Sequence, residues 1–345
     1  MADDLELGFA GSGWIASVHG LAVEQVPGLR VTRVASRDPQ RAAAAAARVG
    51  ARACAYDELP DGVPGVVICT PPAVHAAQAL AYVEAGAAVL VEKPLCTTLV
   101  EADALVAATE RGARIAYAEN LVHAPIVQLA LEQRAPIGPL DQLEVRALQD
   151  RPTWGSFLTE AWGGGVLFDL GVHPLAVALL LAAPARPTAV RAELGGADDH
   201  PVDEHAELDL CFDTGLVARV VASWRGGDTP VWDAQASSPT GVVRIELLPD
   251  LRLERDGHTV ALPGLPEGVP PQLEELGYLR QIESFALDLR DGRAPELGPA
   301  FGRSILDVTC AAYHSAATNR SWVQLPFAGP RDRTPLQLWK DRADP

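Results

Sequence analysis

The chain has 345 residues, of which 48% are hydrophobic and 21% charged, and its formal net charge at pH 7 is −17. This length suffices for two ordinary domains, and the composition is typical of a soluble globular protein. The negative charge argues against nucleic acid or an anionic membrane surface as a partner.

The start of the chain and its cysteines predict a cytoplasmic location. The first residues, MADDLELGFAG, are acidic and lead directly into an expected strand, which is unlike a signal peptide. The apolar runs are too short to span a bilayer. The five cysteines are scattered and form no CxxC pair, so we expect reduced thiols and no metal site.

Residues 5–120 alternate between short apolar strands and longer helical patterns. The expected strands are 5–10, 31–36, 65–70, 88–92 and 114–118, and the expected helices are the stretch after Gly13, 40–49, 73–85 and 99–111. Alternation at this spacing predicts the α/β class, with a parallel, doubly wound sheet. We assign residues 1–121 to a dinucleotide-binding Rossmann domain.

After about residue 122 the pattern changes to strands with few helices between them. The expected strands are 142–149, 188–194, 206–212, 216–224, 231–237 and 242–247, and the expected helices are 165–181, 278–289 and 300–317. The alternation in 243–247 is typical of a sheet with one solvated face. We assign 122–345 to an α+β domain with a large, mainly antiparallel sheet, which binds substrate and forms an oligomer.

A glycine-rich turn follows the first expected strand. It reads Gly11, Ser12, Gly13, Trp14, Ile15, Ala16. The first glycine permits a tight turn, the second lets the backbone approach a pyrophosphate, and Ala16 is small enough for helix–strand packing. Unpaired N–H groups at the following helix terminus favour phosphate. These residues are therefore candidates to bind a dinucleotide.

The second strand ends in Ser36, Arg37 and Asp38, where a dinucleotide's adenosine ribose is expected. A hydroxyl followed by a guanidinium suits a 2′-phosphate better than a bare ribose diol. We therefore favour NADP over NAD, with Asp38 in the carboxylate role as the alternative.

The next two strand ends carry further candidates at the carboxyl edge of the sheet, where ligands bind in open α/β folds. Thr70, Pro71 and His75 follow the strand 65–70, although His75 can equally be read as a surface helix residue. Glu92 and Lys93 end the strand 88–92, and Pro94 restrains the backbone beside the Lys93 ammonium. Lys93 is thus expected near the nicotinamide.

The segment Trp162 to His173 reads WGGGVLFDLGVH. Its glycines allow a close backbone approach before an expected helix. Asp169 and His173 are four residues apart, so on a helix they share one face. A carboxylate beside an imidazole sets its tautomer and raises its basicity, although such pairs are also common on helix surfaces.

Together these motifs resemble the Gfo/Idh/MocA family, the group of glucose-fructose oxidoreductase and inositol dehydrogenase. The resemblance is carried by GFAGSGWIA with His19, CTPPAVH, VEKPL, AEN at 118–120 and GGGVLFDLGVH, which span roughly half the chain. It implies that Lys93, Asp169 and His173 are the catalytic residues and that the large sheet packs against a partner subunit. One departure is Ala176, where many members carry an acidic residue.

We expect hydride transfer between NADP(H) or NAD(H) and a secondary alcohol or ketone of a sugar or polyol. His173 takes the hydroxyl proton, Lys93 stabilises the alkoxide, and Asp169 orients His173. Glu119, Asn120 and Trp162 are candidates to contact substrate, and Asn120 also the cofactor. The alternatives are a tightly bound cofactor used in epimerisation or elimination, and a dinucleotide sensor without turnover.

The residues 206–224 also suggest assembly. They are read here as strands with apolar side chains on both faces, among them Leu208, Leu210, Phe212, Val220 and Val221. Large bare apolar patches are rare on monomers. We therefore expect a homodimer or homotetramer through the C-terminal sheet.

Overall fold

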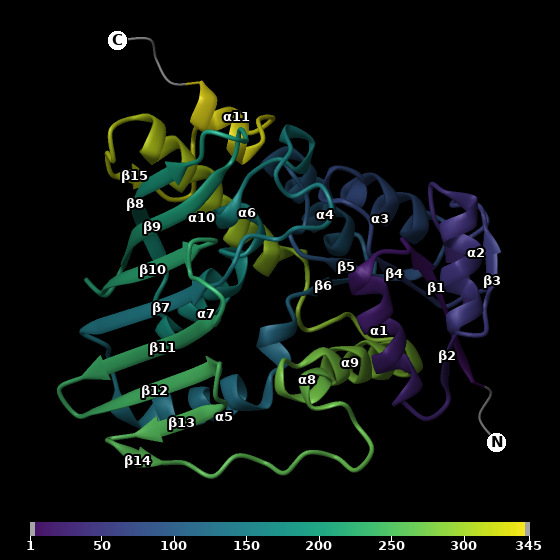
Figure 1. The fold of residues 1–345 in the computed structure, drawn as a ribbon, viewed down its shortest axis with the longest axis horizontal. Helices are drawn as coiled ribbons and strands as arrows, with labels where there is room; N and C mark the ends of the chain where they lie inside the picture. Colours follow the sequence, from purple (N-terminus) through teal and green to yellow (C-terminus); the bar gives the residue numbers. More distant parts are fainter. Residues whose placement is uncertain (1–3, 342–345) are drawn as a thin grey trace. The chain divides into compact units, whose positions relative to one another are not determined.

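The computed structural model describes residues 4–341, which divide into two compact units (Figure 1). The first unit holds the described residues up to Cys96, together with Val100–Asn120 and Leu265–Arg303. The second holds Thr97–Leu99, Leu121–Gly264 and the described residues from Ser304 onward. The segment Leu265–Arg303 was assigned from the sequence to the second domain, but by its contacts it belongs to the first unit.

The first unit is built on a six-stranded parallel sheet with the order β3-β2-β1-β4-β5-β6. Its strands are β1 Leu5–Ala10, β2 Leu29–Ala35, β3 Arg52–Cys54, β4 Gly65–Ile68, β5 Ala88–Glu92 and β6 Ile115–Ala118. Its helices are α1 Trp14–Glu24, α2 Pro39–Arg48, the 3-10 turn η1 Pro72–Val74, α3 His75–Glu84, α4 Leu99–Glu110, α8 Pro271–Glu275, α9 Tyr278–Asp291 and the start of α10 Pro299–Ala317. The strand order reverses between β1 and β4, where such sheets bind ligands.

Burial on both faces explains why β4 and β5 read as continuous apolar runs, since every residue of each is buried. Helix α9 covers part of this sheet with Ile282, Phe285 and Leu289, which share one helical face. A Cβ built on Gly65 would lie 2.8 Å from Leu289 Cδ1, so the close approach of α9 requires glycine there.

The second unit is built on a nine-stranded sheet with the order β14-β13-β12-β11-β7-β10-β9-β8-β15. Its strands are β7 Gln142–Leu148, β8 Pro187–Gly196, β9 Asp203–Phe212, β10 Val217–Ser223, β11 Val231–Ser238, β12 Gly241–Leu248, β13 Arg252–Arg255, β14 His258–Thr259 and β15 Val323–Gln324. Among the described strands of this sheet, only β7 and β10 pair in parallel. Its other elements are η2 Asn120–His123, α5 Pro125–Arg134, η3 Ala135–Ile137, η4 Glu160–Trp162, α6 Val166–Asp169, α7 Val172–Ala182, the rest of α10 and α11 Pro335–Lys340.

The two faces of this sheet differ in chemistry. Leu208, Leu210 and Phe212 alternate with polar residues along β9 and are buried on one face, which α6 and α7 cover. The other face carries charged side chains, including Arg219 paired with Glu207 at 2.6 Å. The expectation of apolar residues on both faces therefore fails for β9, whose named residues share one parity. It holds for β10, where Val220 and Val221 are consecutive and lie on opposite faces.

The helix expected over 165–181 is interrupted. Helix α6 ends at Asp169, α7 begins at Val172, and the axes on either side of the break meet at 44°. A Cβ on Gly171 would lie 2.5 Å from the Leu167 carbonyl oxygen, so glycine permits the tight turn at the break. Asp169 and His173 therefore do not share the face of one continuous helix.

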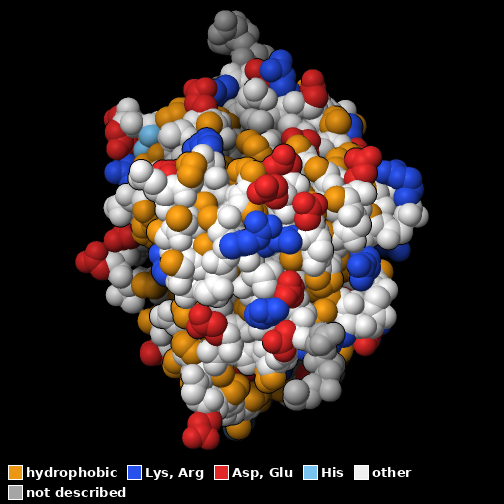
Figure 2. All heavy atoms as spheres, turned by 90° about the vertical axis from the view of Figure 1, so that its right-hand side faces the viewer, with side chains coloured by type: hydrophobic (Ala, Val, Ile, Leu, Met, Phe, Trp, Pro, Cys, Tyr) orange, Lys and Arg blue, Asp and Glu red, His pale blue; other side chains and the backbone are white. Residues whose placement is uncertain are grey.

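The fold class expected from the sequence, a Rossmann unit followed by a large mainly antiparallel sheet, is confirmed. Within the part of the chain that the structure describes, no single helix is long and apolar enough to cross a membrane; the bent pair Glu160–Asp169 and Val172–Ala182 meets the length and composition criteria only together. The face drawn in Figure 2 intersperses acidic and basic side chains, so the net charge is not gathered there into one acidic patch.

Candidate functional site

The turn from β1 to α1 has the backbone of a phosphate-binding loop. Gly11 has φ +117°, and a Cβ there would lie 2.5 Å from the Cys69 carbonyl oxygen, so only glycine fits. A Cβ on Gly13 would have no described atom within 4 Å. No described side chain caps α1, and its first turn contains no acidic residue. The turn thus offers open space and unpaired N–H groups to an anion.

The same turn is tied to the end of β2. The Ser12 hydroxyl donates a hydrogen bond of 2.9 Å to the Ser36 hydroxyl, and the Arg37 side chain is exposed. Asp38 Oδ1 accepts from the backbone N–H groups of Gln40 and Arg41 and so caps α2. Asp38 Oδ1 is thus engaged as a helix cap, and the cofactor contacts of Ser36, Arg37 and Asp38 remain predictions.

His75 links the ends of β4 and β5. It is fully buried, with Nε2 2.6 Å from the Thr70 carbonyl oxygen and Nδ1 2.9 Å from the Pro94 carbonyl oxygen. Burial lowers the pKa of His75, while the two carbonyls and the charge of Glu92 act in the opposite direction. The reading of His75 as a surface helix residue is wrong, and its ring joins the Thr70–Pro71 loop to the loop after Lys93.

Glu92 and Lys93 lie where β5 ends, and Glu92 forms a buried pair that the sequence analysis did not foresee. Its Oε1 accepts a 2.6 Å hydrogen bond from His19 Nε2, and its Oε2 accepts 3.0 Å from the Lys93 backbone N–H. His19 is fully enclosed and lies edge-on to Tyr278. Burial, with the charges of Glu92 and Glu119, raises the pKa of Tyr278. Through Glu92, the backbone at the half-buried Lys93 is therefore linked to His19 of α1.

Glu119 and Asn120 follow β6 and are both buried. Asn120 Nδ2 donates a 2.7 Å hydrogen bond to the Leu276 carbonyl oxygen, which joins the end of β6 to the segment that returns to the first unit. The Asn120 amide therefore has a structural partner, and its predicted contacts with cofactor and substrate remain predictions.

In the second unit, Asp203 fixes the glycine segment before α6. Its Oδ1 accepts 3.0 Å from the Gly165 N–H and its Oδ2 accepts 2.9 Å from the Leu167 N–H. The Tyr313 hydroxyl also donates to Asp203 and accepts 2.9 Å from Gly165. Burial raises the pKa of Asp203, while these donors act against that shift. Neither Asp203 nor Tyr313 was among the site residues predicted from the sequence.

Glycine is required in this segment because backbone and side chains approach closely. A Cβ on Gly165 would lie 2.2 Å from the Asp203 carbonyl oxygen, and one on Gly164 would lie 2.4 Å from Phe168 Cβ. Trp162 precedes the glycines and packs against Phe157 at a ring distance of 4.5 Å.

Asp169 and His173 stand at either side of the α6–α7 break, and both are buried. His173 is the second residue of α7, and its N–H donates 3.1 Å to the Leu170 carbonyl oxygen. The imidazole faces Trp232, with ring centroids 5.3 Å apart and planes tilted by 32°. A turn rather than a helix face therefore governs the positions of this predicted pair.

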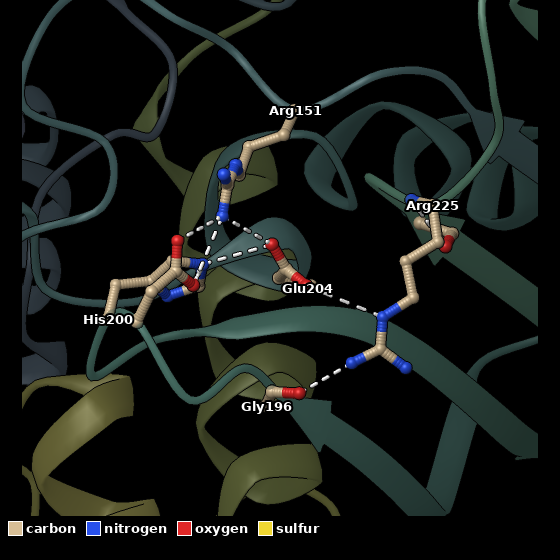
Figure 3. Close-up of polar contacts among 7 residues, drawn as sticks. Arg151, Gly196, His200, Glu204 and Arg225 are labelled. Carbon is tan, nitrogen blue, oxygen red and sulfur yellow. Dashed lines mark hydrogen bonds and ion pairs between the residues drawn. The ribbon is translucent and has the colours of Figure 1, made fainter.

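A separate polar cluster lies among the ends of β7, β9 and β10 (Figure 3). Asp199, His200 and Glu204 have the spacing of metal ligands, but Arg151 Nη1 lies 2.9 Å from Asp199 and 3.1 Å from Glu204. Arg151 lowers the pKa of Asp199. Because a guanidinium lies among these carboxylates, we describe the cluster as an ion-pair network.

Comparison with known proteins gives two matches to family models. Residues 5–119 match an oxidoreductase family described by its NAD-binding Rossmann fold, and residues 131–235 match the GFO/IDH/MocA C-terminal domain. The first match covers the glycine turn, the strand ends and Lys93. The second covers the glycine segment, Asp169 and His173.

Curated relatives and a solved structure agree with these matches. D-xylose 1-dehydrogenase (NADP(+)) 2 of Haloferax volcanii is 27% identical over 327 residues, which cover 90% of this chain and 96% of the relative. UDP-N-acetylglucosamine 3-dehydrogenase of Acidithiobacillus ferrooxidans is 32% identical over 225 residues, 64% of this chain and 67% of the relative. GenD2 from gentamicin A biosynthesis, solved with NAD, is 26% identical, with a TM-score of 0.84 over 94% of this chain and 97% of that one.

Proposed function

Because the chain belongs to the GFO/IDH/MocA family of NAD(P)-binding oxidoreductases that act on sugars and polyols, we propose that it transfers hydride between a nicotinamide dinucleotide and a secondary alcohol or ketone carbon of a sugar-like polyol. The carrying observation is the β1–α1 turn, where Gly11 has no room for a side chain and Gly13 faces open space. A dinucleotide's phosphates fit the uncapped start of α1.

The bound nicotinamide supplies the hydride acceptor or donor. In the oxidation direction, His173 accepts the proton of the substrate hydroxyl through a ring nitrogen. The role we assign to Lys93 is to stabilise the developing negative charge on the substrate oxygen. Asp169 orients His173. These roles come from the family resemblance, and the fixed backbone around Lys93 and His173 supports them.

We propose NADP(H) as the preferred cofactor. Ser36 and Arg37 carry a hydroxyl and an exposed guanidinium at the end of β2, and Asp38 is engaged in capping α2. A guanidinium suits a phosphate through charge-assisted hydrogen bonds. We also propose that Thr70, Pro71 and His75 shape the cofactor crevice.

Glu119, Asn120 and Trp162 remain our candidates for substrate contacts. Ala176 is fully buried in α7, so no acidic side chain is available at that position. We propose a substrate whose recognition does not depend on a carboxylate there. Nucleotide-activated sugars, free sugars, inositols and sugar-containing natural products are the classes to compare.

A substrate panel tests the proposal. The purified protein is incubated with NADP or NAD and with a UDP-sugar, xylose, levoglucosan, inositol and an aminoglycoside, and formation of reduced cofactor is followed by absorbance. The ketone forms are tested with the reduced cofactors. We expect turnover with at least one polyol or ketone, whereas cofactor binding without turnover across the whole panel would favour the sensor alternative.

The epimerase or eliminase alternative needs a different measurement. An enzyme that uses its cofactor for transient oxidation regenerates it in every cycle, so it turns over without added NAD(P). Mass spectrometry identifies any cofactor that co-purifies, and product formation is then measured with none added. Simple dehydrogenation predicts that product and reduced cofactor form in equal amounts.

A further inference from the structure

Trp232 and His173 form a stacked pair in the second unit. Trp232 lies on β11 and His173 near the start of α7 (Figure 1), and their ring centroids are 5.3 Å apart with planes tilted by 32°. This distance lies within the range in which offset aromatic pairs attract. His173 is only 5% exposed, so its imidazole is surrounded by protein atoms, and the indole of Trp232 is one of the groups that it contacts.

The sheet itself directs Trp232 toward the covered face. Ala234 and Ala236 have the same parity along β11 and are buried, whereas Asp233 has the opposite parity and pairs with Arg146. Trp232 also pairs with Ala147 of β7, a buried residue on that covered face. Helix α7, which carries His173, packs against β7.

A β-bulge adjoins Trp232. In the pairing of β11 with β12, Trp232 lies opposite Leu248 and Asp233 lies opposite Glu246, so Leu247 is the extra residue. Bulges bend a strand and re-aim side chains, and they are common beside active sites. The extra residue belongs to β12, so the irregularity bends that strand beside Trp232, while the pairing of Trp232 with Ala147 of β7 stays regular.

The indole is not placed by a hydrogen bond of its own N–H. Trp232 Nε1 is buried, and none of the residues from 4 to 341 offers it an acceptor. Buried tryptophan N–H groups usually find a partner. Trp232 therefore contacts His173 through the face of its indole ring and not through its N–H group. A phenylalanine ring, which has no N–H group, should make the same contact.

We propose that Trp232 is a positioning residue that holds the His173 imidazole in its working orientation by stacking on it. The inference rests on the proposed function, in which His173 is the base. An imidazole that rotates about its side-chain bonds presents its ring nitrogen to the substrate hydroxyl for only part of the time, and small misplacements of catalytic groups reduce rates strongly. The indole, packed against one side of the ring, limits that rotation.

The test compares Trp232→Phe, which keeps an aromatic ring, with Trp232→Leu, which removes it. Trp322→Leu is the matched control, since Trp322 is 42% exposed and stacks on Arg191 instead. The first readout is the ¹H–¹³C spectrum of the histidine rings, with the His173 signal identified by its loss in His173→Ala. We expect the ring-current displacement of that signal to persist in Trp232→Phe and in the control and to vanish in Trp232→Leu.

The second readout separates positioning from binding. We expect kcat to fall about ten- to a hundredfold in Trp232→Leu, with an unchanged cofactor Kd, and to stay within about threefold of wild type in Trp232→Phe. Should the Leu variant fail to fold, Trp232→Met gives the same comparison with a bulkier flexible side chain.

Results that reject the role of Trp232 differ from the result that rejects His173 as the base. An unchanged His173 signal in Trp232→Leu overturns the inference, because the stacking would then be absent in solution. A lost displacement with unchanged kcat also overturns it, since the contact would be structural only. Near wild-type turnover of His173→Ala would instead reject His173 as the base, and with it any catalytic purpose for the stacking.

Discussion

At the scale of single residues, Arg37 is the side chain that our proposal makes responsible for the preference for NADP(H). Its exposed guanidinium follows Ser36, and Asp38 is engaged in capping α2. Arg37→Leu should weaken NADP(H) binding by about 1.5–3 kcal/mol, the range for a hydrogen bond to a charged group, and leave NAD(H) binding nearly unchanged. Fluorescence titration with both cofactors measures this. Arg48→Leu, at the opposite end of α2, is the control, and equal losses for both cofactors would contradict the reading.

Tyr313 provides a sharp test of the Asp203 network. Its hydroxyl donates to Asp203 and accepts from the Gly165 N–H, and all three groups are buried. Tyr313→Phe should lower the free energy of unfolding by about 1.5–3 kcal/mol. Tyr82→Phe is the matched control, because the Tyr82 hydroxyl is buried without a hydrogen-bond partner among the described residues. Denaturant unfolding measures the free energy of unfolding of both variants. Equal losses in the two variants would contradict the claim that the Asp203–Tyr313 hydrogen bonds stabilise the protein.

Features that depend on neighbouring residues could be predicted from the sequence, whereas contacts between distant residues could not. The glycine turn is local in the chain, so its role as a tight turn is readable from the sequence, and Gly11 has the positive φ expected of it. Asp203 lies 38 residues from Gly165, and Tyr313 lies 148 residues from it. Partners at such separations leave no local pattern, and the His173–Trp232 contact was missed for the same reason.

At the scale of elements, the break between α6 and α7 has no room for an added methyl group. A Cβ on Gly171 would lie 2.5 Å from the Leu167 carbonyl oxygen. Gly171→Ala should therefore destabilise the protein by about 1–3 kcal/mol through overpacking, and turnover should fall because α7 carries His173. A Cβ on Gly264 meets no described atom within 4 Å, so Gly264→Ala should stay within about 0.5 kcal/mol of wild type. Thermal unfolding beside steady-state rates makes the comparison.

The elements also show which patterns the sequence conveys. The strands β4 and β5 are buried throughout, so their apolar runs were readable. The apolar face of α9 predicts a helix at nearly the observed position, but periodicity does not say which sheet it covers, and α9 packs on the first unit's sheet. The strands β3, β14 and β15 span only two or three residues, too few for any period to show.

At the scale of the whole molecule, oligomer formation through the C-terminal sheet stays a prediction. The uncovered face carries Arg146, Arg219, Glu144 and Glu207 beside Leu148 and Val221 around a shallow hollow. We therefore expect charge complementarity to add to apolar burial as the attraction. We predict a homodimer or homotetramer that weakens as salt is raised.

Light scattering at micromolar concentration and two salt concentrations tests this assembly. Arg219→Glu should shift the equilibrium toward monomer, whereas Arg111→Glu, an exposed position on the first unit, should not. A wild-type protein that is a monodisperse monomer at low salt would refute the prediction.

The central claim is hydride transfer assisted by Lys93 and His173, and one paired measurement tests it most directly. Lys93→Met keeps most of the side-chain length but removes the ammonium, and His173→Ala removes the imidazole. Cofactor dissociation constants from fluorescence titration are compared with steady-state turnover of whichever polyol reacts. We predict that each variant loses at least about a hundredfold in turnover while cofactor affinity changes little, and that the double variant loses less than the product of the single losses. Near wild-type turnover in both single variants would contradict the account.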